Sequence, residues 1–128
     1  MTALKKILHV DDDADIREIA RLSLEQIGGF EVVQCSSGAD ALATAPDFKP
    51  DLFLFDVMMP NMSGDVLWQE LSKDPELGKI PVIFMTAKVE RSYTDGLRSK
   101  GALSVLEKPF DPIGLPDEIK RIWDARTP

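Results

Sequence analysis

The sequence predicts an α/β fold in which helices cover both faces of a single parallel sheet. Two observations support this prediction: five apolar segments that are continuous rather than alternating, and a spacing between them of about 20 to 30 residues. Continuous apolar segments are typical of parallel strands buried on both faces, and this spacing leaves room for a crossover helix after each strand. The five segments are residues 7–10, 32–33, 52–55, 82–85 and 103–106.

The first two predicted helices lie between strands one, two and three. In the first helix apolar residues recur every three or four positions, as on one helix face, and we expect Gly28 and Gly29 to end it. The second helix follows Ser36 and Ser37, and we expect Pro46 to limit it. The apolar positions are Ile16, Ile19, Ala20, Leu24 and Ile27 in the first helix, and Ala39, Leu42 and Ala43 in the second.

Three further helices complete the strand and helix alternation. We expect Ser63 to cap the third helix, with Asp65 in its favourable first turn. The fourth is short and weakened by Gly96, and the fifth begins near Leu115, because Pro116 is tolerated only in a first turn. Their apolar positions are Val66, Leu67 and Leu71, then Val89, Tyr93 and Leu97, and finally Ile119 and Ile122.

Length and composition restrict the class of protein. A chain of 128 residues fits one domain, which we expect to comprise residues 1–128. Its formal net charge of −7 disfavours a nucleic-acid or membrane-surface partner, because phosphate backbones and anionic lipids repel it. One cysteine, Cys35, excludes an internal disulfide and is expected to be a small buried filler. No apolar segment approaches the ~20 residues that cross a membrane, so we expect a cytoplasmic location.

Polar residues follow four of the five predicted strands. In an open parallel sheet the ligand crevice lies beyond the carboxyl ends of the strands, so these side chains are expected to meet at one edge. They are Asp11, Asp12 and Asp13 after the first strand, Asp56 at the end of the third, Thr86 after the fourth and Lys108 after the fifth.

This set of side chains suits phosphoryl transfer to a carboxylate. Neighbouring carboxylates repel each other, and a divalent cation relieves that repulsion. Mg²⁺ is usually bound by one or two carboxylates together with water and phosphate oxygens, and Mn²⁺ can replace it. An ammonium and a hydroxyl stabilise the charge on the transferred group, so Asp56 can act as the nucleophile that forms an aspartyl phosphate.

The motifs together resemble a bacterial response-regulator receiver domain of the single-domain chemotaxis type. The resemblance extends from Lys5 to about Asp124 and implies a flavodoxin-like sheet with strand order 2-1-3-4-5 and five helices. It rests on the segments VDDD at 10–13, DVMMP at 56–60 with Gly64, MTA at 85–87 and KPF at 108–110.

The resemblance also implies a role for each matching position. Asp56 is the phosphoacceptor, Asp12 binds the metal directly, and Asp11 binds it mainly through water. The further roles are the Met58 carbonyl as a metal ligand, Thr86 and the Ala87 main chain as phosphoryl-binding groups, Lys108 as the partner of the phosphoryl group or of Asp56, and a cis bond before Pro109 that aims Lys108 inward.

Three positions are expected to adjust the lifetime and the output of the phosphorylated state. Met58 and Lys88 flank the path of an attacking water, and neither acts as a general base at neutral pH, so the aspartyl phosphate should be long-lived. Val105 occupies the place where most receivers carry a movable aromatic ring, so the signal must pass through the loop after Thr86 and the fourth helix, or through Tyr93 or Phe110 instead.

The receiver resemblance implies a sensor histidine kinase or a histidine phosphotransfer protein as phosphodonor. The implied downstream partner is a protein that binds the face formed by the fourth helix, fifth strand and fifth helix, with the chain as a monomer or a weak phosphorylation-dependent dimer. We expect a stand-alone receiver that catalyses only its own phosphorylation and slow dephosphorylation. The alternative is a receiver from a longer hybrid kinase or multidomain regulator.

Two other classes fit the sequence less well. Asp11, Asp13 and Asp15 alternate as in a calcium loop, but Ile16 and Leu22 stand where that loop needs Gly and Glu, and Asp13 is better explained as a helix cap. An aspartate-nucleophile phosphatase uses an Asp-x-Asp loop after its first strand, as in residues 11–13, but that class leaves Asp56 without a role.

Overall fold

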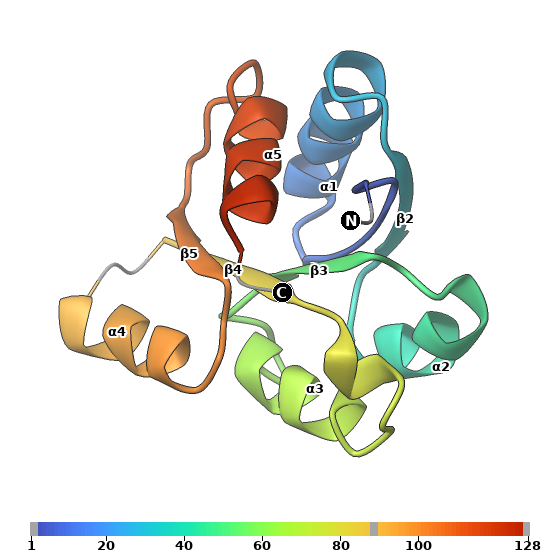
Figure 1. Cartoon of the computed structure of the whole chain (residues 1–128), viewed down its shortest axis with the longest axis vertical. Coiled ribbons are helices and arrows are strands. Elements are labelled where there is room, and N and C mark those ends of the chain that lie inside the picture. The colour runs from blue at the N-terminus through green and yellow to red at the C-terminus, as the bar shows by residue number, and fades with distance from the viewer. Residues whose placement is uncertain (1–2, 88–89, 127–128) are drawn as a thin grey trace.

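The computed structural model describes residues 3–87 and 90–126, and in it five parallel strands form one sheet (Figure 1). The strand order is β2-β1-β3-β4-β5, as the resemblance to receiver domains implied. The strands are β1 (Lys6–Val10), β2 (Glu31–Cys35), β3 (Leu52–Asp56), β4 (Val82–Thr86) and β5 (Ser104–Glu107).

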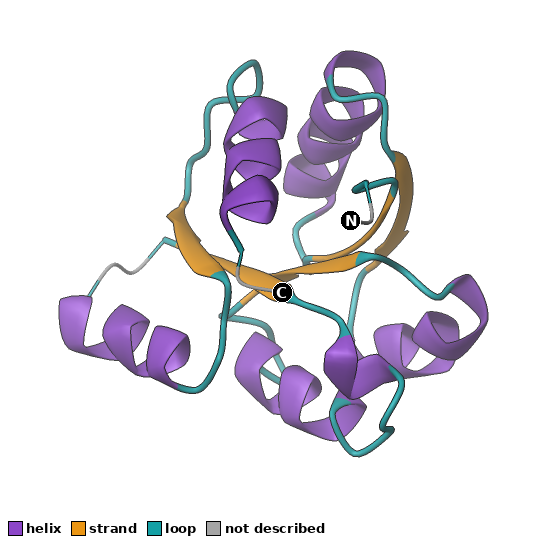
Figure 2. Ribbon diagram, viewed as in Figure 1, coloured by secondary structure: helices purple, strands orange, loops and turns teal. Residues whose placement is uncertain are grey.

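Five α-helices in the described part cover both faces of the sheet. Helices α1 and α5 lie on one face, and α2, α3 and α4 lie on the other (Figures 1 and 2). The α-helices are α1 (Ala14–Arg21), α2 (Gly38–Phe48), α3 (Gly64–Leu71), α4 (Arg91–Ser99) and α5 (Leu115–Ala125). A π-helical segment (Leu22–Ile27) continues α1, and a 3₁₀ turn (Leu77–Lys79) precedes β4.

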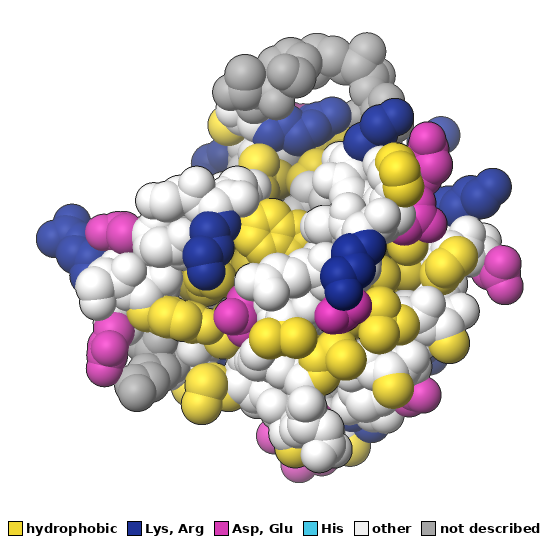
Figure 3. Space-filling view, turned by 90° about the horizontal axis from the view of Figure 1, so that it is seen from below, with side chains coloured by type: hydrophobic (Ala, Val, Ile, Leu, Met, Phe, Trp, Pro, Cys, Tyr) yellow, Lys and Arg dark blue, Asp and Glu magenta, His cyan; other side chains and the backbone are white. Residues whose placement is uncertain are grey.

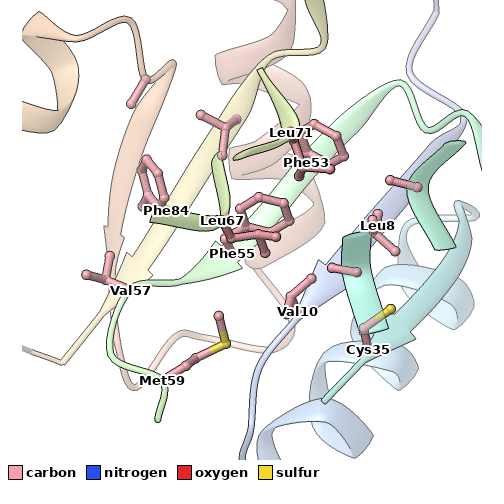
Figure 4. Packing of buried hydrophobic residues seen from close by; sticks show 14 of the residues in the cluster. Leu8, Val10, Cys35, Phe53, Phe55, Val57, Met59, Leu67, Leu71 and Phe84 are labelled. Atoms are coloured by element: carbon pink, nitrogen blue, oxygen red, sulfur yellow. The ribbon is translucent and has the colours of Figure 1, made fainter. Parts of the chain in front are cut away.

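The core is divided by the sheet into two layers. Every residue of β3 and β4 is buried, which explains why all but the last residue of each strand are apolar. On the side of α2 and α3, Phe53 and Phe55 stack with ring centroids 4.9 Å apart, and Cys35 packs in the same cluster, as expected for a buried filler (Figure 4). The central strands are therefore held from both sides, which places their carboxyl ends firmly.

The first helix matches its prediction at both ends. Asp13 caps α1 by accepting hydrogen bonds from the main-chain N–H groups of Asp15 and Ile16. The helical stretch ends at Gly28, and Gly29 follows with a φ of 72°, a conformation that glycine adopts without steric cost.

One predicted helix boundary and one predicted capping hydrogen bond are wrong in detail. Pro46 does not limit α2, which continues to Phe48, because a proline in the last turn removes only one intrahelical hydrogen bond. Ser63 occupies the N-cap position of α3, but its side chain makes no capping hydrogen bond, and the Gly64 N–H bonds instead to the Val57 carbonyl at 2.9 Å. The turn from β3 into α3 therefore depends on main-chain contacts.

The last two helices agree with the sequence in their buried positions only in part. In α4 the buried residues are Thr94 and Leu97, while Tyr93 is 40% exposed. Val89, predicted to lie on this helix face, is outside the described residues. Helix α5 begins at Leu115 with Pro116 in its first turn, as predicted, and Ile119 is fully buried.

The surface carries charges of both signs. On the face formed by α2, α3 and α4, acidic and basic side chains are scattered between hydrophobic ones rather than gathered by sign (Figure 3). In the described part of the chain, no helix is long and apolar enough to cross a membrane.

Candidate functional site

The carboxyl ends of β1, β3, β4 and β5 place the predicted polar residues at one edge of the sheet. Asp56 ends β3 and pairs in register with Met85, one residue before Thr86, which ends β4. Asp11 directly follows β1 and is fully buried, and Asp56 and Thr86 are 3% and 1% exposed. Buried polar groups at the end of an otherwise apolar sheet indicate a built site rather than a solvated edge.

Three carboxylates of this edge form a compact acidic cluster. One carboxylate oxygen from each of Asp11, Asp12 and Asp56 lies within 4.8 Å of the others. Asp12 is exposed, so the cluster is open to solvent on one side. Oxygen ligands in this number, with room for water, fit a divalent cation of the Mg²⁺ type. The sequence prediction that these three residues meet is confirmed, and the cluster is able to hold a divalent metal.

Lys108 provides the positive charge next to this cluster. Its Nζ atom donates a 2.9 Å hydrogen bond to Oδ2 of Asp11 and lies 3.3 Å from Oδ1 of Asp56. The sequence predicted the pairing with Asp56 but not the shorter one with Asp11. Burial alone would lower the pKa of Lys108, but the hydrogen bond and charge of Asp11, together with Asp56, raise it above its ordinary value, so the side chain stays protonated. The bond between Lys108 and Pro109 is cis, as expected.

The carboxyl group of Asp56 is held less acidic than usual. Burial, followed by the charge of Asp11, raises its pKa from 3.8 to about 6. The charge and hydrogen bond of Lys108 and the main chain of Met58 oppose this shift. The group is therefore ionised at neutral pH, but less firmly than a solvated aspartate, which suits a carboxylate that must act as a nucleophile near pH 7.

Asp11 is engaged on every side by groups of the protein. Its main-chain N–H bonds to the Cys35 carbonyl at 3.2 Å, its Oδ1 accepts the Asp13 N–H at 2.9 Å, and its carbonyl oxygen accepts Nη1 of Arg17 at 2.8 Å. Arg17 was not identified from the sequence, because its contact depends on how α1 packs. Since Asp13 caps α1, the calcium-loop interpretation loses a ligand that it requires.

The turn after Asp56 leaves space for no larger residue than glycine at position 64. A Cβ atom on Gly64 would overlap the carbonyl oxygen of Asp56. The start of α3 thus lies directly against the main chain of Asp56, which explains why the resembling motif includes this glycine.

A small cavity lies at Thr86, the last residue of β4. It measures about 170 Å³ and is lined by Met58, Thr86, Glu90 and Tyr93. Met58 is 65% exposed, so this side of the cavity is open to solvent. The sequence pointed to Met58 and Thr86 as site residues and to Tyr93 as an alternative moving ring, but it gave no sign that Glu90 would line the same cavity.

The remaining predicted positions are placed as follows. Val105 is half-buried on β5, in register with Phe84, and Ala87 is exposed directly after β4. Lys88 lies outside the described residues, so its position relative to Asp56 is not described.

Comparisons with known proteins agree with this site. The family model of the response regulator receiver domain matches residues 7–120. The chain is 38% identical over 124 residues to the phosphate regulon transcriptional regulatory protein PhoB of Pseudomonas aeruginosa, an alignment that covers 97% of this chain and 54% of PhoB. Among solved structures, the chemotaxis response regulator CheY4 of Vibrio cholerae superposes with a TM-score of 0.84 at 28% identity, covering 94% of this chain and 99% of that one.

The chain therefore belongs to the response regulator receiver domain family, the signal-accepting module of two-component systems. Within the family its relatives include longer proteins, since it spans about half the length of the curated relatives that it matches. One of these, 35% identical over 109 residues that cover 84% of this chain and 44% of the relative, is the DNA-binding dual master transcriptional regulator RpaA of Synechocystis. Such relatives conflict with the expectation, drawn from net charge, of no nucleic-acid partner.

Proposed function

We propose that this chain accepts a phosphoryl group on Asp56 and uses it to switch the binding of a partner. The single observation that carries the proposal is the buried constellation of Asp11, Asp56 and Lys108 at the open edge of the sheet, with Lys108 within 3.3 Å of both carboxylates. The donor is a phosphohistidine on a sensor histidine kinase or a histidine phosphotransfer protein, as membership of the family implies.

In the transfer itself, a carboxylate oxygen of Asp56 attacks the phosphorus atom. A phosphorus–oxygen bond forms as the phosphorus–nitrogen bond to the donor histidine breaks, and the leaving imidazole takes the electron pair and a proton from the solvent. The ammonium of Lys108 turns from the carboxylates to the new phosphoryl oxygens, and Thr86 and the main chain of Ala87 donate hydrogen bonds to them.

Asp11, Asp12, Asp56 and the Met58 carbonyl are the groups that would hold Mg²⁺ or Mn²⁺ in this site. When bound, the cation neutralises charge on the phosphoryl oxygens. The protein must keep three carboxylates close together in spite of their repulsion. The hydrogen bonds that Asp11 accepts from the Asp13 main chain and from Lys108 hold it in place.

Two positions govern how long the phosphoryl group remains. Met58 lines the cavity next to Thr86 and offers no proton acceptor that could activate water. The amine of Lys88 is protonated at neutral pH and cannot act as a base either. The residues at positions 58 and 88 therefore support slow hydrolysis. We propose that catalysis is limited to this self-phosphorylation and slow dephosphorylation, so the chain is a switch rather than a turnover enzyme.

The alternative of an aspartate-nucleophile phosphatase is disfavoured by the state of Asp11. That mechanism needs a free carboxylate oxygen after the first strand, whereas Asp11 is fully buried and both of its carboxylate oxygens accept hydrogen bonds. Asp56 has the more suitable surroundings for the nucleophile.

The output of the switch follows from the family. We propose a protein partner on the face of α4, β5 and α5, with the chain as a monomer or a weak dimer. A second candidate output is DNA binding through a further domain, which the 38% identity to the transcriptional regulator PhoB favours. The mass of the protein isolated from its own cells distinguishes a stand-alone receiver from a longer regulator.

The proposed reaction is tested by intact-mass spectrometry after incubation with acetyl phosphate and Mg²⁺. We expect one phosphoryl group per chain in the unaltered protein and none in Asp56→Asn, which keeps the shape of the side chain but removes the nucleophile. Asp51→Asn is the matched control, because that aspartate caps main-chain groups at the opposite end of the sheet. Equal labelling of Asp56→Asn and the unaltered protein would exclude Asp56 as phosphoacceptor.

A further inference from the structure

A pair of polar side chains lies on the face of the sheet that α1 covers, close in sequence to the acidic cluster. His9 of β1 and Gln34 of β2 are register partners and therefore extend to the same face of the sheet. His9 is fully buried, and its strand neighbours Leu8 and Val10 are buried apolar residues. Polar side chains are costly at such positions unless they form hydrogen bonds. The partners of this pair therefore indicate what it contributes to the protein.

The amide of Gln34 connects two strands to a helix. Its Nε2 atom lies 2.7 Å from the main-chain oxygen of Arg17 in α1 and 2.9 Å from Nδ1 of His9. Because a carbonyl oxygen only accepts hydrogen bonds, the NH₂ group must face Arg17, and its second N–H donates to His9. The ring of His9 is then neutral with its proton on Nε2, in agreement with burial, which with the charges of Lys108 and Arg17 lowers its pKa to about 3.

The side chain of the same Arg17 returns to the acidic cluster. Its Nη1 atom donates a 2.8 Å hydrogen bond to the carbonyl oxygen of Asp11. Three hydrogen bonds thus connect His9 to Asp11 through Gln34 and Arg17. In the sequence Asp11 is only two residues after His9. These hydrogen bonds close a ring that fixes the first turns of α1 against β1 and β2 and spans the loop that carries Asp11 and Asp12.

We propose that Gln34 and Arg17, anchored on His9, are positioning residues of the cation site: they hold the loop of residues 11–13 so that its carboxylates meet Asp56 at the spacing that Mg²⁺ requires. This inference rests on the proposed function, since it concerns the same site. Mg²⁺ demands near-ideal octahedral geometry, so a small displacement of a ligand loop costs affinity. Groups that orient metal ligands typically change affinity by 10–100-fold when removed.

The first test is the neutral substitution Gln34→Met, which keeps the length of the side chain and removes both donors. Titration calorimetry with Mg²⁺ alone should show an affinity lower by about tenfold. Gln69→Met is the matched control, because it makes the same chemical change on the exposed surface of α3 and should leave the affinity unaltered. No charge changes in either variant, so a difference between them cannot come from electrostatic attraction.

The second test uses the sign of the effect in Arg17→Met. Removing a positive charge next to an acidic cluster would by Coulomb's law strengthen the binding of a cation. Loss of the hydrogen bond to Asp11 has the opposite result, and we expect Mg²⁺ to bind more weakly. Arg17 is only half-buried, so this variant decides the question even where Gln34→Met fails to fold.

The outcomes separate the two proposals. Absence of Mg²⁺ binding and of labelling in the unaltered protein would contradict the proposed function itself. Normal binding and labelling there, with Mg²⁺ affinity unchanged in Gln34→Met or increased in Arg17→Met, would overturn the positioning role and leave the proposed function intact.

Discussion

At the scale of single residues, the site contains one carboxyl group, that of Asp56, whose surroundings work against its ordinary ionisation. Asp56 has a raised pKa because it is buried beside Asp11, and it is only partly relieved by Lys108. A carboxylate in such surroundings destabilises the fold at neutral pH, and a cation that binds it relieves the repulsion. This combination is typical of functional sites rather than of structural ion pairs.

Replacing Asp56 should therefore stabilise the metal-free protein. Because the folded state holds the Asp56 proton up to about pH 6, against 3.8 ordinarily, the free energy of unfolding falls as the pH rises through this window. Asp56→Asn should be more stable than the unaltered protein at pH 7 by roughly 1 to 3 kcal/mol, given about 1.4 kcal/mol per pKa unit. Urea denaturation without Mg²⁺ measures this difference, which should shrink toward pH 4. A difference independent of pH would contradict the assignment.

His9 should have the opposite effect on stability. Its pKa falls from 6.5 to about 3 on folding, so the unfolded chain binds the proton more readily, and stability is lost as the pH decreases from about 6.5. His9→Leu cannot ionise and should lose less stability on acidification than the unaltered protein, by up to about 1.4 kcal/mol per pH unit. Denaturation curves of both proteins at pH 5, 6 and 7 provide the comparison. Parallel pH profiles would show that His9 titrates normally.

At the scale of elements, the position of Asp11, Asp56, Thr86 and Lys108 could be predicted because it follows from strand ends in a parallel sheet. Each residue needs only its own strand and the sheet order to be placed. The contacts of Arg17 and Gln34 could not be predicted, since they depend on how closely α1 packs against the β1–β2 edge. The shorter bond of Lys108 to Asp11 rather than Asp56 is likewise a matter of tertiary distances that no local pattern encodes.

The valine at position 105 leads to a prediction about how the signal passes between elements. A β-branched valine has few rotamers and no ring to move, so phosphorylation should be transmitted from Thr86 through the following loop and α4. Helix α4 supplies Tyr93 to the cavity that Thr86 also lines, so a movement of Thr86 changes the surroundings of α4. Addition of beryllofluoride and Mg²⁺, as a phosphoryl mimic, should shift the amide resonances of Thr86, Ala87 and α4 more than those of β5. Shifts confined to β5, with Thr86 unchanged, would refute this route.

At the scale of the whole molecule, cation binding should be coupled to folding. The three carboxylates come from the loop after β1 and the end of β3, which meet only in the folded chain, so we expect a divalent cation such as Mg²⁺ to bind the native state and not the unfolded one. Such a ligand stabilises the fold by about 2.7 kcal/mol at 100 times its dissociation constant. Mg²⁺ should therefore raise the urea midpoint of the unaltered protein, most strongly above pH 6, where Asp56 is ionised.

The variant Asp12→Ala tests that coupling at the open side of the cluster. Asp12 is exposed and does not support the core, so its loss should leave the metal-free stability nearly unchanged while removing the gain that Mg²⁺ gives. Asp74→Ala, another exposed aspartate but distant from the cluster, serves as the control and should keep the full gain. An equal gain in Asp12→Ala and the control would mean that Mg²⁺ stabilises the protein by binding elsewhere. The expected contrast would instead tie the gain in stability to the cluster of Asp11, Asp12 and Asp56, which includes the proposed phosphoacceptor.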